Sequence, residues 1–132
     1  MAIIYDSVAK KIPQTKEVRY YASVKTIKQV GEKEVAKLIA DETTLNPKEA
    51  EMAIAQLQKV MLNLLKGGYS VKLGDWASFS VAVSSGGVTT KEAVTASIIK
   101  KVNVNCRFAS AFRESINKAD FVPVSKFEKK EE

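Results

Sequence analysis

The chain has 132 residues, of which 45% are apolar, so it can form one domain with a buried core. It contains no histidine and one cysteine, Cys106, which excludes the commonest general base, the usual zinc ligand sets and an internal disulfide. No glycine-rich phosphate loop, membrane-length apolar run or signal-peptide pattern occurs. We therefore expect a cytoplasmic protein that is not an enzyme, with no catalytic residue, metal, cofactor, small-molecule substrate or membrane association. Cys106 lies in an apolar stretch and is expected to be buried.

The net charge of +6 is unevenly distributed along the chain. Residues 1–28 and residues 84–118 each hold six Lys or Arg and two Asp or Glu, so each segment carries +4. Residues 29–83 and residues 119–132 each carry −1, from six basic against seven acidic and three against four. Positive charge confined to two segments favours a polyanion as partner. An ordinary solvated basic surface is the alternative, and charge alone does not decide between them.

Two β-rich runs are predicted before residue 29. Residues 2–5 read as a strand, residues 10–14 as a turn or loop, and residues 19–24 as a second strand rich in aromatic and β-branched side chains. The two strands can pair as a hairpin. Tyr20 and Tyr21 cannot both point inward from a strand, so one of them is expected to be exposed.

Two helices are predicted next, over residues 32–42 and 47–66, joined by a linker short enough for a helical hairpin. Asn46 can accept a hydrogen bond from a first-turn amide, and Pro47 fits the first helical position. Gly67 is expected to supply the left-handed conformation that ends the second helix.

The second helix carries an apolar stripe about five turns long. One short helix cannot cover that stripe, so the sequence predicts a second subunit that buries the remainder, most simply in a homodimer. The stripe consists of Ala50, Ala53, Ile54, Leu57, Val60, Met61, Leu64 and Leu65.

Strands and one short helix are predicted after the double glycine. Strands are expected at 69–73, 76–83 and 101–106, with a break at 84–87, no assignment for 88–99 and a short helix from about Ser110. Residues 125–132 are charged and balanced, and are expected to form a disordered tail.

This order of elements resembles the bacterial histone-like family of HU and integration host factor, which are dimeric DNA-bending proteins. Asp75 and Ala77 stand where that family has two glycines, so the turn is expected to differ in detail. The matching residues of the strand and aromatic turn are Val71, Leu73, Trp76 and Phe79.

The resemblance implies an α+β, HU-like fold made of a helical hairpin, an antiparallel β-sheet and a short C-terminal helix. An HU-like DNA-binding domain would span residues 29–124. Residues 1–28 would be an added N-terminal β-hairpin packed on this core, as in a longer histone-like variant that the chain resembles.

The β-arm is the main departure from the family pattern. The family's arm carries several arginines and a proline that wedges between base pairs and kinks DNA. Residues 84–99 hold one basic residue, Lys91, and no proline. Deep intercalation is therefore not expected.

The candidate DNA-binding residues are basic positions in the second positive segment. On an alternating strand, Lys101 shares a solvent face with Asn103 and Asn105, an arrangement suited to phosphate contacts, although a merely soluble strand face is equally compatible. A solubility role is favoured for the earlier group Lys10, Lys11, Lys16 and Arg19, and a packing role for Trp76. The candidates are Lys91, Lys100, Lys101, Arg107 and Arg113.

The sequence thus predicts a histone-like protein of the nucleoid that binds double-stranded DNA with low sequence specificity, mainly through phosphates. DNA compaction or architecture would be its role. The alternative is a structural or protein-interaction module that keeps an HU-like fold but has lost arm-mediated DNA bending.

Overall fold

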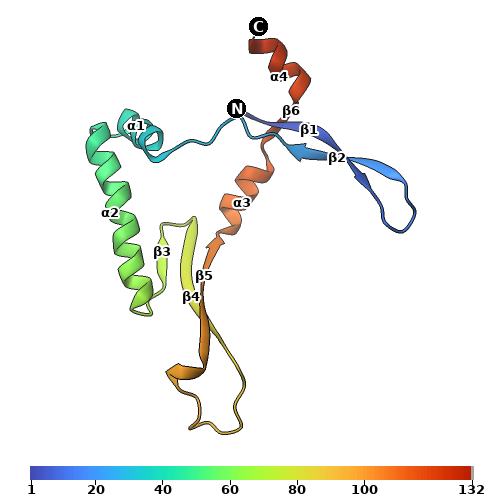
Figure 1. Ribbon diagram of the computed structural model, residues 1–132. Helices are drawn as coiled ribbons and strands as arrows, with labels where there is room; N and C mark the ends of the chain where they lie inside the picture. The colour runs from blue at the N-terminus through green and yellow to red at the C-terminus, as the bar shows by residue number, and fades with distance from the viewer. Residues whose placement is uncertain (132) are drawn as a thin grey trace. The chain divides into compact units, whose positions relative to one another are not determined.

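The computed structural model describes residues 1–131, with side chains described up to Phe127. The chain divides into two compact units: Gly31–Arg113 forms one, and Met1–Val30 together with Glu114–Glu132 forms the other. The elements are α-helices and β-strands in the order shown in Figure 1, so the predicted α+β class is confirmed. No helix in the described part of the chain is both long and apolar enough to cross a membrane.

The unit that contains both termini is built on a three-stranded sheet. Its strands are β1 (Ala2–Lys11), β2 (Val18–Val24) and β6 (Asp120–Pro123), in the order β2-β1-β6. β1 and β2 pair antiparallel, whereas β6 pairs parallel to the first residues of β1. The sequence analysis placed residues 114–124 in the central domain. The structure instead groups residues 114–131 with the N-terminal strands, because β6 hydrogen-bonds to β1.

Helix α4 (Val124–Glu131) follows β6 directly and packs on β1 and β6. The sequence analysis expected residues 125–132 to be disordered, so α4 corrects that expectation, and Glu132 lies outside the described residues. Phe127 supplies the physical reason: it lines an apolar hollow of about 360 Å³ with Ile4 and Val122, among others.

The second unit begins with the helical hairpin, α1 (Glu32–Glu42) and α2 (Pro47–Lys66), and the bounds of both helices match the prediction. The Asn46 side chain accepts a hydrogen bond of 2.8 Å from the Glu49 amide and donates one to the Glu49 carboxylate. The Asn46 side chain therefore caps the Glu49 amide in the first turn of α2, and the contact with the Glu49 carboxylate holds that side chain in place.

The glycine with the left-handed conformation after α2 lies one residue later than predicted. Gly68, with φ +84°, is in the left-handed region, whereas Gly67 has φ −82°. The Gly68 amide donates to the Leu65 carbonyl, and the Tyr69 amide to the Leu64 carbonyl, at 3.1 and 3.0 Å. This is the Schellman arrangement, in which the glycine after the cap carries the positive φ.

The sheet of this unit has the order β3-β4-β5, with all neighbours antiparallel. Its strands are β3 (Val71–Leu73), β4 (Ala77–Ser85) and β5 (Ile99–Phe108), and a short 3-10 turn, η1 (Ala96–Ile98), precedes β5. Gly74, at φ +53°, makes the β3–β4 turn. Because Gly74 takes the left-handed position, Asp75 and Ala77 can replace the glycines that the family pattern places there.

Helix α3 (Ser110–Asn117) continues from β5. The Ala109 amide donates to the Trp76 carbonyl at 2.8 Å, which ties the end of β5 to the β3–β4 turn. The rings of Trp76, Phe108 and Phe112 have centroids 5.6 to 6.4 Å apart. Trp76 therefore packs against two aromatic rings, as the sequence analysis favoured.

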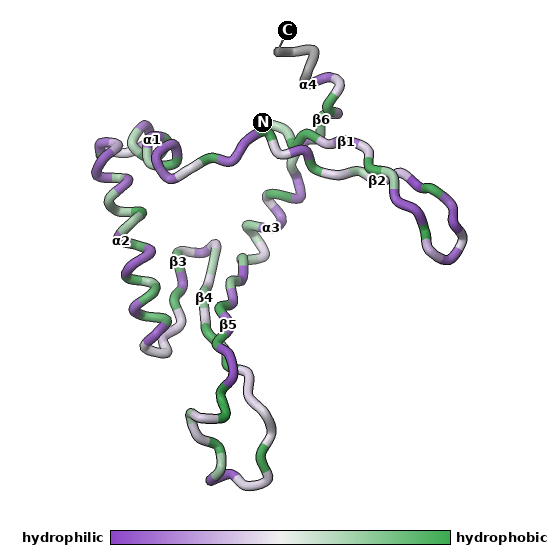
Figure 2. The backbone as a smooth tube through the Cα atoms, in the orientation of Figure 1, coloured by the Kyte–Doolittle hydropathy of each residue, from purple (hydrophilic) through white to green (hydrophobic). Residues whose placement is uncertain are grey.

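The core of the single chain is thin. Among the described residues, the buried apolar side chains are Ile4, Ala36, Ala50 and Ala77, and no large side chain is fully buried. Apolar positions nevertheless recur along α2 and the sheet strands, as the green segments of Figure 2 show. Cys106 is exposed, which corrects the expectation of burial. It lies on an apolar sheet face that the described chain does not cover.

Candidate nucleic-acid interface

The β3-β4-β5 sheet has one polar and one apolar face. In the register, Ser78 of β4 lies beside Lys72 of β3 on one side and beside Arg107 of β5 on the other. Since side chains alternate along a strand, these three residues share a face. Asn103, Asn105 and Lys101 extend the same face along β5.

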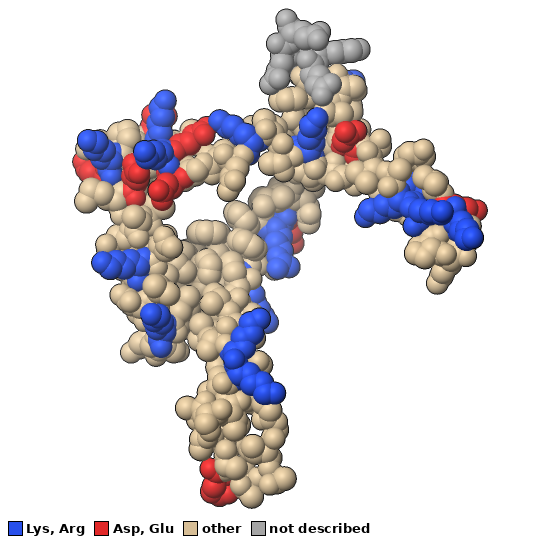
Figure 3. Space-filling view, viewed as in Figure 1, with Lys and Arg blue, Asp and Glu red and all other residues tan. Residues whose placement is uncertain are grey.

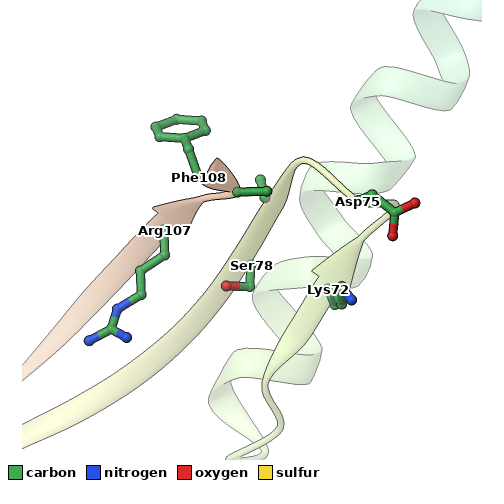
Figure 4. Close-up of a pocket in the computed structure, with 7 residues that line it drawn as sticks. Lys72, Asp75, Ser78, Arg107 and Phe108 are labelled. Carbon is green, nitrogen blue, oxygen red and sulfur yellow. The ribbon is translucent and has the colours of Figure 1, made fainter. Parts of the chain in front are cut away.

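The polar face is hollowed around this row of residues. Figure 4 shows Ser78 between the Arg107 and Lys72 side chains, with Asp75 in the neighbouring turn. The hollow has a volume of about 330 Å³, and its lining is Lys72, Asp75, Ala77, Ser78, Arg107, Phe108 and Ala109. A guanidinium, an ammonium and a hydroxyl side by side are hydrogen-bond donors of the kind that bind phosphate oxygens. The Asp75 carboxylate limits that site on one side.

Lys72 was not among the candidate residues, although the sequence contained the signal for it. Val71 and Leu73 flank it and point to the apolar face, so the alternation that placed Lys101 on a solvent face places Lys72 there too. The pairing of β3 with β4 could not be read from alternation. That pairing is what brings Lys72 beside Ser78 and Arg107.

Lys100 and Lys101 lie at the distal end of the sheet. Lys101 is opposite Ser84 and Ile99 is opposite Ser85, so Lys100 is the extra residue of a β-bulge. The Cε and Nζ atoms of Lys100 lie 3.8 Å from the position that a Cβ on Gly86 would occupy. The bulge therefore directs the Lys100 ammonium to the point where the chain leaves β4.

The other two candidates lie on different elements. Lys91 lies in the loop between β4 and η1, where its carbonyl accepts a hydrogen bond from Val94, and Glu92 follows it. Arg113 is exposed on α3 and is not among the residues that line the hollow. The structure thus joins Arg107 with Lys72, sets Lys100 and Lys101 at the distal end of the same sheet, and leaves Lys91 and Arg113 on separate elements.

The opposite face of the sheet is apolar and largely uncovered. Val83, Val102 and Val104 are 56%, 57% and 67% exposed, and by the register they share a face with Phe79 and Cys106. Helix α2 packs against β3 and β4. On α2 itself, Leu57 and Val60 are each 43% exposed. The apolar stripe of the helix and the apolar face of the sheet are both without a full covering layer in the described chain.

Comparison with known proteins identifies the family. A family model described as an HU domain fused to a wHTH, Ig or glycine-rich motif matches residues 1–123. Since that match covers almost the whole chain, the protein belongs to this HU family, and the resemblance inferred from the sequence is confirmed. No curated protein matches the chain.

Two solved structures are similar to the chain. A bacterial protein from Bacteroides vulgatus, described as DNA-binding, aligns with a TM-score of 0.59 and 15% identity over 92% of this chain. The alignment spans 48% of that protein, so this chain covers about half the length of its relative. HU of Anabaena, crystallised with DNA, aligns with a TM-score of 0.49 and 14% identity, over 67% of this chain and 99% of its own.

Proposed function

We propose that the protein binds double-stranded DNA mainly through backbone phosphates, with little sequence preference. The observation that carries this proposal is the row Lys72, Ser78 and Arg107 on the polar sheet face of an HU-family chain. The ammonium of Lys72, the hydroxyl of Ser78 and the guanidinium of Arg107 suit phosphate oxygens. Phosphate contacts fix a protein on a duplex but do not read its sequence.

The proposed contact residues are those of the sheet and the elements next to it. Lys101 and Arg107 lie on the polar face itself, and Lys100 extends it at the bulge. Lys91 and Arg113 are peripheral contacts from the loop and from α3. Lys72 joins the set because it flanks the same hollow as Arg107.

A homodimer is the assembly that we propose. The exposed apolar stripe of α2 and the exposed apolar face of the sheet belong to one compact unit, and a second copy offers matching surfaces. An obligate dimer interface resembles a domain core cut in half, which is how Val102, Val104, Leu57 and Val60 are displayed in the single chain. DNA compaction or architecture in the nucleoid is the role that such a dimer would serve.

The loop between β4 and η1 favours a second candidate function. Residues 84–99 carry one cation, Lys91, beside one anion, Glu92, so this arm has no net charge. Its apolar residues Val88 and Val94 are 41% and 63% exposed. A protein-interaction module that keeps the HU fold without arm-mediated DNA bending would use such a surface.

A salt titration of binding separates the two candidates. The full chain is titrated against a random-sequence duplex and against several defined duplexes at two salt concentrations. Phosphate binding requires that affinity fall steeply with salt and that all duplexes bind alike. Binding that ignores salt, or one duplex preferred a thousandfold over the rest, contradicts the DNA proposal. No binding at low salt favours the interaction module.

A further inference from the structure

The outer part of the β1–β2 hairpin, residues 6–23, projects beyond its sheet and is called the distal hairpin below. β6 pairs with β1 only from Ala2 to Tyr5, so β1 and β2 continue alone from Asp6 onward (Figure 1). Every residue of β1 beyond Tyr5 and every residue of β2 is exposed. A two-stranded ribbon with no covered face is only marginally stable in water. A ligand that binds the paired strands would therefore stabilise it.

Basic side chains gather near the tip of this hairpin, where Figure 3 shows a blue cluster. Lys10 lies directly opposite Arg19 in the register. Like charges at directly opposed positions repel each other and destabilise the strand pair. The guanidinium of Arg19 lies 3.7 Å from the Glu17 carboxylate, but both side chains are more than 60% exposed, so this ion pair contributes little. A phosphate bound between Lys10 and Arg19 would remove the repulsion.

The turn of the hairpin adds a third cation in an unfavourable backbone conformation. Lys16 has φ 57°, in the left-handed region that glycine adopts more easily. Two backbone hydrogen bonds of 2.9 Å hold the turn, from Ile12 to Glu17 and from Lys16 to Ile12. Lys11 follows Lys10 on the other face of the ribbon. Among the described residues, no carboxylate forms an ion pair with any of these three lysines.

Aromatic side chains accompany the cations. The Lys10 ammonium lies 5.7 Å from the centre of the Tyr21 ring, within reach of a cation–π contact. Tyr20, on the other face, is 73% exposed. A ribbon of two strands has the width that the major groove of a duplex admits. Cations and tyrosine hydroxyls along both faces match the phosphates that border such a groove.

We propose that the distal hairpin is a second phosphate-binding element, which contacts double-stranded DNA through Lys10, Lys11, Lys16 and Arg19. The proposal rests on the proposed DNA-binding function and adds a contact surface in the other compact unit. An acidic protein partner is the competing occupant. The opposed pair Lys10 and Arg19 favours DNA, because a duplex presents regularly spaced anions to both strands of a ribbon at once.

The test uses the full chain and a random-sequence duplex. The variant Lys10→Gln/Arg19→Gln removes the opposed cations. The matched control Lys48→Gln/Lys59→Gln removes two exposed charges from the outer face of α2. We expect the logarithmic salt slope of the hairpin variant to be shallower by about two, because each lost phosphate contact removes about 0.9. The footprint on DNA should also shorten. The control and the charge-preserving variant Lys10→Arg/Arg19→Lys should bind like the parent.

Two results would overturn the proposal, and they differ in what they leave standing. If the hairpin variant keeps the parent's affinity, slope and footprint while Lys101→Gln/Arg107→Gln binds more weakly, the hairpin is not a DNA contact and the proposed function stands. If the parent chain does not bind the duplex at low salt, both proposals fail. The variant Lys11→Gln/Lys16→Gln, which leaves the strand pair Lys10 and Arg19 intact, repeats the test should the first variant misfold.

Discussion

The β3-β4-β5 sheet and the distal hairpin both display cations on exposed strands, but they sort their side chains differently. In the sheet, Lys72, Arg107 and Lys101 lie on one face, and the valines of β4 and β5 lie on the other. In the hairpin, each face mixes the two kinds: Lys10 and Arg19 lie next to Val8 and Tyr21. A sorted sheet suits two different partners, whereas a mixed ribbon suits one partner that contacts both of its faces.

This difference in sorting determines which kind of partner each region can bind. The apolar sheet face suits an apolar covering surface, for which we have proposed a second copy of the chain. The hairpin has no face that is apolar enough for that purpose. Its Val18 and Tyr20 are 55% and 73% exposed between charged neighbours. Substitutions in the two regions should therefore have unlike consequences.

The largest effect is expected at the proposed dimer interface of the central unit. Leu57→Asp places a carboxylate on the α2 stripe, where the dimer would bury it without a partner. Because an obligate dimer has no stable folded monomer, we expect loss of both the dimer mass and the helical signal. Light scattering and circular dichroism measure the two quantities.

Ala55→Asp is the matched control, because it places the same charge on the opposite, exposed face of α2. It should leave the dimer intact. A Leu57→Asp protein with the mass of a single chain and a full helical signal would contradict the proposed role of the stripe.

The next effect concerns DNA affinity through the polar sheet face. Lys101→Gln/Arg107→Gln should weaken duplex binding clearly and make the logarithmic salt slope shallower by about two. Lys91→Ala should change little, since that residue lies in the loop beyond the strands and beside Glu92. Binding isotherms at several salt concentrations measure both variants. If Lys91→Ala abolishes binding and the double variant does not, the loop is the main contact instead of the sheet.

A smaller effect is expected on the shape of the bound DNA. No proline occurs in residues 84–99, so the arm lacks the wedge that unstacks a base step. We expect a bend smaller than the roughly 20–90° that an inserted apolar side chain produces. Energy transfer between dyes at the duplex ends measures the bend. A bend in the upper part of that range would show that another side chain, such as Val88 or Val94, is inserted.

Much of the central unit could be predicted because its signals are local. The apolar period and the cap at Asn46 defined α2 to the residue, and alternation sorted the faces of β5. The left-handed residue after α2 was predicted one position early, since the sequence of two glycines does not show which of them takes the positive φ.

The remaining features depend on contacts between segments far apart in the chain. β6 is four residues long, and only its parallel pairing with β1 shows that it is a strand. The packing of helix α4 likewise involves a hollow that Phe127 lines together with Ile4, which is distant in the sequence. Lys72 was missed because its neighbours on the polar face come from β4 and β5. Periodicity within one segment carries no information about any of these pairings.

The smallest effects are expected from substitutions in the turns of the two regions. Gly74 at φ +53° and Lys16 at φ 57° have nearly the same backbone conformation, but only the first is a glycine. Gly74→Ala should therefore destabilise the central unit by about 1 kcal/mol, because a Cβ is unfavourable there. Gly87→Ala is the control, since its φ is not positive and a Cβ there meets no atom within 4 Å. Chemical denaturation measures both.

Lys16→Gly makes the opposite change in the distal hairpin. Removing the Cβ should stabilise the turn by up to about 1 kcal/mol, less the extra freedom that glycine gives the unfolded chain. The Ile12 amide, which donates to the Glu17 carbonyl across this turn, should then exchange its hydrogen no faster than in the parent. At the same time the salt slope of DNA binding should become shallower by about one, because one phosphate contact is lost. A more stable turn that binds DNA less well would mean that the lysine is kept for its charge. An unchanged salt slope would show that Lys16 makes no phosphate contact.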